Sequence, residues 1–116
     1  MTDNIVVVKS KTFAIRIVRL YQYLCNSRKE FTLSRQLLRC GTSIGANIKE
    51  AIRGQSKADF TAKMNIALKE ASEAEYWIEI LYETGYINNR QFKSIYTDCQ
   101  ELLKLLFSIV KSSKKE

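Results

Sequence analysis

The sequence contains no histidine and no proline, and this limits both its chemistry and its backbone. Of its 116 residues, four are glycines and three are cysteines. Without histidine the common zinc sites and the most frequent general base are missing, and no Cys–His or Ser–His nucleophile can form. An enzyme would have to work with carboxylates or lysines alone. Because residues that break helices are so few, we expect long helices.

The cysteines do not form a pattern that suggests a metal site or a disulfide framework. Cys25, Cys40 and Cys99 are odd in number, lie far apart and include no C-x-x-C pair. Each falls at or beside an apolar helical position, which is typical of buried free thiols. We therefore predict no catalytic residues, no cofactor and no metal site, and we interpret the chain as a non-enzyme.

Long apolar stretches are also missing. The longest nearly apolar run, Leu102–Val110, is interrupted by Lys104 and is far shorter than the roughly 20 residues that a membrane span requires. The first ten residues, MTDNIVVVKS, lack the charged start and long apolar segment of a secretory signal. These features predict a soluble, cytoplasmic protein with no membrane contact.

The positive charge is concentrated in the first part of the chain. The formal net charge is +7. Residues 1–69 carry thirteen Lys and Arg against four Asp and Glu, a balance of +9, whereas residues 70–116 carry six against eight, a balance of −2. Such asymmetry allows the first part of the chain to have a polyanionic partner without requiring one.

Apolar residues recur every three or four positions, which indicates amphipathic helices. We predict four of them, followed by a short tail at residues 112–116. Their approximate bounds are 10–25, 33–53, 57–84 and 89–111. Residues 5–8 are β-branched and could form a short extended arm. Four helices with short joints predict a single all-α domain over residues 1–116, an antiparallel up-down-up-down four-helix bundle.

Capping signals support these boundaries. Thr32 is a candidate N-cap for the second helix, and Gly54 a candidate stop. Ser56 and Asp59 have the spacing of a capping box at the start of the third helix. Gly85 is expected at its carboxyl end.

The stretch CGTSIGANIKEA, residues 40–51, places Gly41 and Gly45 inside the second helix, on its buried side. Each glycine costs a helix about 1 kcal/mol relative to alanine. Small residues four apart either let another helix approach closely or mark a kink. Asn47 lies at the edge of the apolar stripe. We expect a hydrogen-bonded structural amide that caps a neighbouring helix or fixes its register.

The far side of the second helix carries a row of cations, and basic residues of the first helix could extend it. The candidate nucleic-acid-binding residues are Arg16, Arg19, Arg35, Arg39, Lys49 and Arg53. Tyr23 lies near the two arginines of the first helix. Such side chains would contact phosphates with little dependence on sequence. The simpler interpretation is a solvated charged face.

On the third helix, Ile66, Trp77 and Ile80 lie outside the core stripe. Isolated apolar residues on a surface are normal. A tryptophan and two isoleucines on one flank, however, suggest more apolar surface than one bundle can bury. Self-association is the natural way to cover it, so we predict a homo-oligomer with these residues at its interface.

Two segments resemble a known family. They read LSRQLLRCGTSIGANIKEA over residues 33–51 and KADFTAKMNIALKEASEAEYWIEILYETGYI over residues 57–87. The order and spacing of their motif residues resemble the 23S ribosomal-RNA intervening-sequence proteins, from about Lys9 to Val110. The residues that carry this likeness are Ser43, Ile44, Asn47, Ile48, Glu50, Asp59, Phe60, Ala67, Leu68, Glu73, Glu75, Leu81, Gly85 and Tyr86. Many members have a glycine directly after the motif glutamate, where this chain has Ala51, so the second helix is expected to run further here.

This resemblance implies a four-helix bundle that assembles into a ring-like homopentamer. Some members are encoded within insertions in large-subunit ribosomal RNA genes and have been labelled ribosomal proteins. A related branch serves as the basic accessory protein of diversity-generating retroelements, where it binds nucleic acid and partners a reverse transcriptase. No catalytic residues carry over from the family.

Two functions remain open from the sequence. The first is a non-enzymatic oligomer that binds the phosphate backbone of RNA or DNA through a basic face. The second is an oligomeric scaffold that binds a protein partner and has no nucleic-acid activity. The third helix is rich in glutamates that could meet a basic partner, which is the feature that favours the second function.

Overall fold

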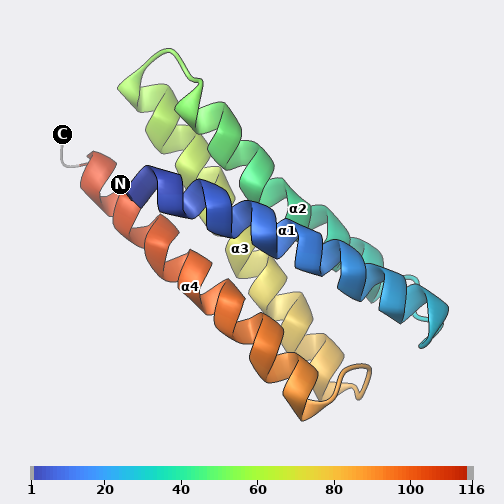
Figure 1. Ribbon diagram of the computed structural model, residues 1–116. Coiled ribbons are helices and arrows are strands. Elements are labelled where there is room, and N and C mark those ends of the chain that lie inside the picture. Colours follow the sequence, from blue (N-terminus) through green and yellow to red (C-terminus); the bar gives the residue numbers. More distant parts are fainter. Residues whose placement is uncertain (1, 115–116) are drawn as a thin grey trace.

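Within the residues that the structure describes, the fold consists of four long helices joined by short loops (Figure 1). The computed structural model describes the backbone of residues 2–114 and the side chains of residues 5–114. The helices are α1 (Thr2–Asn26), α2 (Leu33–Ile52), α3 (Lys57–Glu83) and α4 (Asn89–Lys114).

Successive helices run antiparallel, as the residues that meet between them demonstrate. Gly41 lies against Ile17 of α1 and Gly45 lies against Ser10, so rising numbers on one helix meet falling numbers on the other. The same reversed order holds for the pairs Arg39–Glu73, Glu50–Lys63, Glu79–Tyr96 and Thr61–Ser113. The predicted all-α, up-down-up-down bundle is therefore confirmed.

The apolar repeats of all four helices meet in one continuous core. Its largest fully buried side chains are Val6, Phe13, Ile17, Leu24, Leu37, Ile44, Ile48, Met64, Ile78, Leu81, Leu102 and Leu106. Burying a side chain of this size contributes roughly 1.5–3 kcal/mol each. The core face of α3 also carries the buried alanines Ala67, Ala71 and Ala74, which let its neighbours pack closely.

The prediction for the amino-terminal end was wrong. Residues 5–8 form no extended arm, because α1 begins at Thr2 rather than near residue 10. Val6 is completely buried in the core, one turn before Ser10. This burial outweighs the modest helix penalty of β-branched residues. Packing in the tertiary structure has overridden local propensity here.

The predicted end of the last helix was also too early. Helix α4 continues past residue 111 to Lys114. Within this extension the Ser113 hydroxyl lies 2.9 Å from the Thr61 hydroxyl, which donates to it from α3. Of the predicted tail at 112–116, residues 115 and 116 lie outside the described residues.

A glutamate rather than Thr32 caps the start of α2. The Thr32 side chain makes no capping hydrogen bond, although Thr32 occupies the predicted N-cap position. The buried Glu30 carboxylate instead accepts hydrogen bonds from the backbone N–H groups of Thr32, Leu33 and Ser34, at 3.1, 2.9 and 2.7 Å. Lys29 turns the chain just before it with a positive φ of 56°. The carboxylate satisfies three amides that a helix start leaves without partners.

The pKa of Glu30 reflects this role. Burial alone would raise the pKa of the carboxyl group, but the three backbone N–H donors outweigh burial and lower it below its ordinary value of 4.5. The negative charge also lies at the positive end of the α2 dipole. Glu30 is thus most stabilising when ionised.

The other caps follow the sequence more closely. The Ser56 hydroxyl accepts from the Asp59 N–H at 3.0 Å, which confirms the predicted cap of α3. Gly85 follows the end of α3 with a φ of 85°, in the left-handed region that favours glycine. At the start of α4, Asn88 and Gln91 each accept the other's backbone N–H through their side chains, both at 2.8 Å.

Helix α1 lies directly over the two glycines of α2. A Cβ atom added at Gly41 would lie 2.9 Å from both Cγ atoms of Ile17, and one at Gly45 would lie 3.3 Å from the Ser10 hydroxyl oxygen. Helix α2 is continuous from Leu33 to Ile52, so the glycines do not break it. They lie where α1 packs directly against the backbone of α2.

Asn47 is half-buried on α2 and bonds within its own helix. Its side-chain amide donates to the Ser43 carbonyl oxygen at 2.9 Å and the Ser43 hydroxyl at 3.0 Å. These two donor bonds are local, so they neither cap a neighbouring helix nor fix its register. They satisfy the amide one turn back along α2.

We predict that Gly41→Ala destabilises the protein by about 1–3 kcal/mol, because the branched Ile17 side chain cannot yield to the new methyl group. Gly45→Ala is the matched control, since the Ser10 hydroxyl needs to move only slightly and the gain in helix propensity is about 1 kcal/mol. Urea denaturation of both variants measures the difference. Equal stabilities would contradict a close contact that is specific to Gly41.

We also predict that Glu30→Gln lowers the free energy of unfolding by about 1–2 kcal/mol at pH 7, because the neutral amide is a weaker cap. The folded-state pKa is depressed, so the contribution of the carboxylate is fully present above its unfolded pKa. It is lost as the pH falls through the lower folded pKa. Denaturation of both proteins from pH 7 to pH 3 should show the difference shrinking below about pH 4.5. A constant difference would contradict this.

Candidate nucleic-acid interface

The six basic residues predicted to bind nucleic acid do not form one continuous stripe. Arg35 and Lys49 are exposed on α2 and Arg53 directly after it, whereas Arg39 and Arg16 are engaged by carboxylates of neighbouring helices. The sixth, Arg19, is exposed on α1. The cations therefore separate into those that hold the bundle together and those that face solvent.

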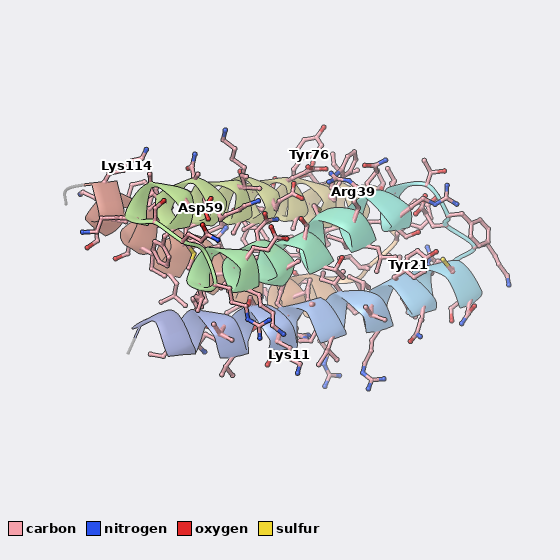
Figure 2. The ribbon with its side chains drawn as sticks, turned by 90° about the horizontal axis from the view of Figure 1, so that it is seen from above. Lys11, Tyr21, Arg39, Asp59, Tyr76 and Lys114 are labelled. Carbon is pink, nitrogen blue, oxygen red and sulfur yellow. The ribbon has the colours of Figure 1, made fainter. Side chains whose placement is uncertain are left out.

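Arg39 belongs to the contact between α2 and α3. Its guanidinium pairs with Glu73, and with Glu70 at 3.3 Å, so it points towards α3 (Figure 2). The hydrogen bond from Arg39, together with one from the Trp77 indole N–H, lowers the pKa of the Glu73 carboxyl group. Two carboxylates thus compensate its charge, and Arg39 adds little to the positive field of the outer surface.

A groove runs between α1 and α2, and we call it the α1–α2 groove. Its volume is about 530 Å³, and its cations are Lys11, Lys49 and Arg53. Gly45 and Ser10 lie in its wall, where α1 packs directly against α2. No acidic side chain of the described part of the chain lines it. Three positive charges therefore border one groove. Figure 2 labels Lys11 on α1.

A second opening lies between α1 and α4, and we call it the α1–α4 slot. Its volume is about 510 Å³, and the basic side chains Arg16, Arg19 and Arg90 line it together with Tyr23. Among residues 5–114, its lining includes no carboxylate. Figure 1 shows α1 and α4 running apart towards the carboxyl end of α1, where the slot lies.

Arg16 of the slot is bonded to α4. It donates to Asp98 at 2.6 Å, to the Ser94 carbonyl at 3.2 Å and to the Ser94 hydroxyl at 2.7 Å. In the loop after α1, Arg28 donates to the Gly85 carbonyl at 3.0 Å and lies over the Tyr86 ring, 5.6 Å from its centroid. Arg16 therefore ties α1 to α4, and Arg28 ties the loop between α1 and α2 to the loop between α3 and α4.

Lys11 and Arg90 were missed by the sequence reasoning. Lys11 lies one residue after Ser10, which faces Gly45, so the close approach of α1 brings it beside Lys49. A helical projection that paired the small residues of the two helices could have found it. Arg90 gives no such signal, because only the tertiary structure brings the first turn of α4 beside α1.

The apolar surface differs from the prediction. Ile66 is exposed on α3, whereas Trp77 is half-buried against the core and donates its indole N–H to Glu73 at 3.1 Å. Ile80 is half-buried. Exposed apolar side chains also lie on the outer side of α1, and we call them the α1 patch. Its members are Ile5, Val7, Val8, Ile15 and Val18, of which Val8 is 64% exposed.

The described residues offer little to catalytic chemistry. Burial raises the pKa of the Cys40 and Cys99 thiols to about 12, so both are protonated near neutral pH and are poor nucleophiles. Within residues 5–114, no three cysteine or acidic side chains converge as metal ligands would. None of the described helices is sufficiently long and apolar to span a bilayer.

Comparison with known proteins gives a family. The sequence model described as 23S rRNA-intervening sequence protein matches residues 2–108. No curated protein matches the chain. A solved structure from Bacteroides thetaiotaomicron, described as a protein with unknown function from the S23 ribosomal protein family, is 58% identical to this chain. The alignment covers 96% of this chain and 99% of the other, with a TM-score of 0.94.

Proposed function

We propose, from the premise that this chain belongs to the family of 23S rRNA-intervening sequence proteins, that it is a non-enzymatic cytoplasmic protein that binds the phosphate backbone of RNA or DNA. One observation carries the proposal. The α1–α2 groove and the α1–α4 slot are lined by six cations and, within residues 5–114, by no carboxylate. The cations are Lys11, Lys49 and Arg53 in the α1–α2 groove and Arg16, Arg19 and Arg90 in the α1–α4 slot. Of the six, Arg16 is paired with Asp98, which lies outside that lining.

The α1–α2 groove suits a polyanion because several of its cations can contact neighbouring phosphates at the same time. Lys11, Lys49 and Arg53 present charge from two helices along one groove. Each phosphate that they neutralise releases condensed counterions, so the affinity should fall steeply with salt, by a slope of about 0.9 per phosphate on duplex DNA. Because lysine and arginine contacts to phosphate carry no sequence information, binding should depend little on sequence.

The position of the carboxylates strengthens this assignment. Several acids of the chain are held in ion pairs with other cations, including Glu70 and Glu73 with Arg39 and Glu101 with Lys9. These pairs lie outside the α1–α2 groove.

Lys49 and Arg53 also line an adjoining opening with Glu50 and Asp59. On the side of the α1–α2 groove, however, a phosphate backbone would meet these two cations without a carboxylate on the walls.

We predict that the double variant Lys49→Glu/Arg53→Glu weakens binding of labelled RNA and duplex DNA at least about tenfold at low salt, and lowers the salt slope by about 2. The matched control is Lys69→Glu/Lys104→Glu, which makes the same change in net charge at exposed positions of α3 and α4. Fluorescence anisotropy across a potassium chloride series measures both quantities.

An equal loss in both double variants would show that only net charge matters and would remove the α1–α2 groove as the site. Absence of binding by the parent protein at low salt would overturn the nucleic-acid function altogether. A salt-independent affinity would do the same, because phosphate contacts require counterion release.

A second candidate function is an oligomeric scaffold for a protein partner, and the α1 patch is the observation that favours it. Val8, Ile15 and Val18 expose apolar side chains along the outer side of α1, and Val7 and Ile5 extend the patch towards the amino terminus. Several exposed apolar side chains on one side of a helix favour a subunit contact. The homopentamer implied by the family resemblance remains a prediction.

We predict that the parent protein is an oligomer in solution and that Val8→Glu/Ile15→Glu converts it to a monomer, because charged side chains cannot be buried without partners. Ile66→Glu tests the originally predicted α3 surface in the same way. Sedimentation equilibrium gives the mass of each protein. A monomeric parent protein would contradict self-association through either surface.

A further inference from the structure

The α1–α4 slot differs from the α1–α2 groove in having an aromatic side chain in its lining. The apolar part of that lining, which we call the floor, consists of Leu20 and the buried Ile95, and Tyr23 of α1 lines the slot with them. The cations stand at the walls, on both helices. A ligand that carried only phosphates would gain nothing from the apolar floor, so the slot is suited to a molecule with both a charged part and a flat apolar part.

The arginines of the slot have different roles. Arg16 is held by Asp98 and by two oxygens of Ser94, so its guanidinium is fixed and its charge is compensated. Arg19 and Arg90 are exposed, and neither forms an ion pair with a carboxylate in the part of the chain that the structure describes. They stand on opposite walls and are the two side chains that can take a phosphate.

The slot has room for one nucleotide, since its volume of about 510 Å³ lies within the range of small-ligand sites. The α1–α2 groove has nearly the same volume, about 530 Å³, so the aromatic lining rather than the size sets the slot apart. In a duplex the faces of the bases are stacked inside and cannot reach the floor. An unpaired base can lie on Tyr23 and Leu20 while its phosphates meet Arg19 and Arg90.

We propose that the α1–α4 slot binds one unpaired nucleotide, so that the protein prefers single-stranded to double-stranded nucleic acid. Tyr23 and the apolar floor hold the base, and Arg19 and Arg90 hold the adjoining phosphates. This inference rests on the proposed nucleic-acid function and adds the class of ligand. The α1–α2 groove binds backbone of either kind.

The test compares a labelled single strand of about 12 nucleotides with its duplex at equal phosphate concentration. We expect the parent protein to bind the single strand about tenfold more tightly, and Tyr23→Ala to remove that preference while leaving duplex affinity within about twofold. Tyr76→Ala is the matched control, because Tyr76 is an exposed tyrosine on α3. It should change neither affinity.

Tyr23 also packs against the core, so Tyr23→Ala could lose binding because it unfolds. A second variant therefore tests the slot without changing a core residue. Arg19→Gln/Arg90→Gln changes only exposed side chains and should weaken single-strand binding more than duplex binding. Tyr23→Phe keeps the ring and should retain the preference. Circular dichroism melting shows which variants are folded.

The outcomes separate the two proposals. Equal affinities for strand and duplex, or a preference that survives in folded Tyr23→Ala or in Arg19→Gln/Arg90→Gln, would overturn the slot while leaving backbone binding by Lys49 and Arg53 intact. Failure of the parent protein to bind either ligand at low salt would overturn both. Loss of the preference in the slot variants, with binding to the duplex unchanged, would support both.

Discussion

The close approach of α1 to α2 at Gly41 is the contact on which the rest of the surface depends. Ile17 occupies the space that a side chain at Gly41 would need, and Ser10 does the same less tightly at Gly45. This contact fixes the distance of α1 from α2 and the rotation of α1 about its own axis. It brings Lys11 beside Lys49, and it leaves α1 to diverge from α4, where the slot opens. A more distant α1 would abolish the α1–α2 groove.

Carboxylates in this protein serve mainly to fix the helices relative to one another. Glu30 holds the start of α2 through three backbone amides, Glu73 joins α3 to α2, and Asp98 joins α4 to α1. Exposed ion pairs of this kind contribute little stability individually. Their effect on the electrostatic field is larger, because each one compensates a nearby cation and so determines which cations remain to act on a partner. The basic character of the surface depends on this selection as much as on the net charge.

Much of the fold was predictable from the sequence because its signals are local. The three- and four-residue spacing of apolar residues, the Ser56 cap and the Gly85 terminator are each contained within one segment. The amino-terminal turn of α1 was not predictable in this way, because Val6 is helical through its burial against other helices. Glu30 was missed as a cap because a carboxylate outside the helix reaches the amides only through the turn at Lys29.

The candidate site was less predictable, because charge compensation acts between segments far apart in the chain. Arg16 and Asp98 are separated by 82 positions, and Arg39 and Glu73 by 34. A helical projection placed Arg39 with Lys49 and Arg53 on one face, but it could not reveal the carboxylates that face Arg39 from α3. Nor could a helical projection show that Arg90 of α4 lies in the same slot as Arg19 of α1. The basic residues were identifiable from the sequence, whereas the two channels that group them emerge only from the packing of α1.

The contact between Ile17 and Gly41 has a consequence for how sequences of this family diverge. Because Ile17 occupies the space that a side chain at position 41 would need, the residue sizes at these two positions should vary inversely through evolution. A relative with alanine at the position of Gly41 should carry a smaller residue, such as valine or alanine, at the position of Ile17. Inverse variation in side-chain volume at these two positions would thus indicate that α1 and α2 stay equally close in relatives whose structures are unknown.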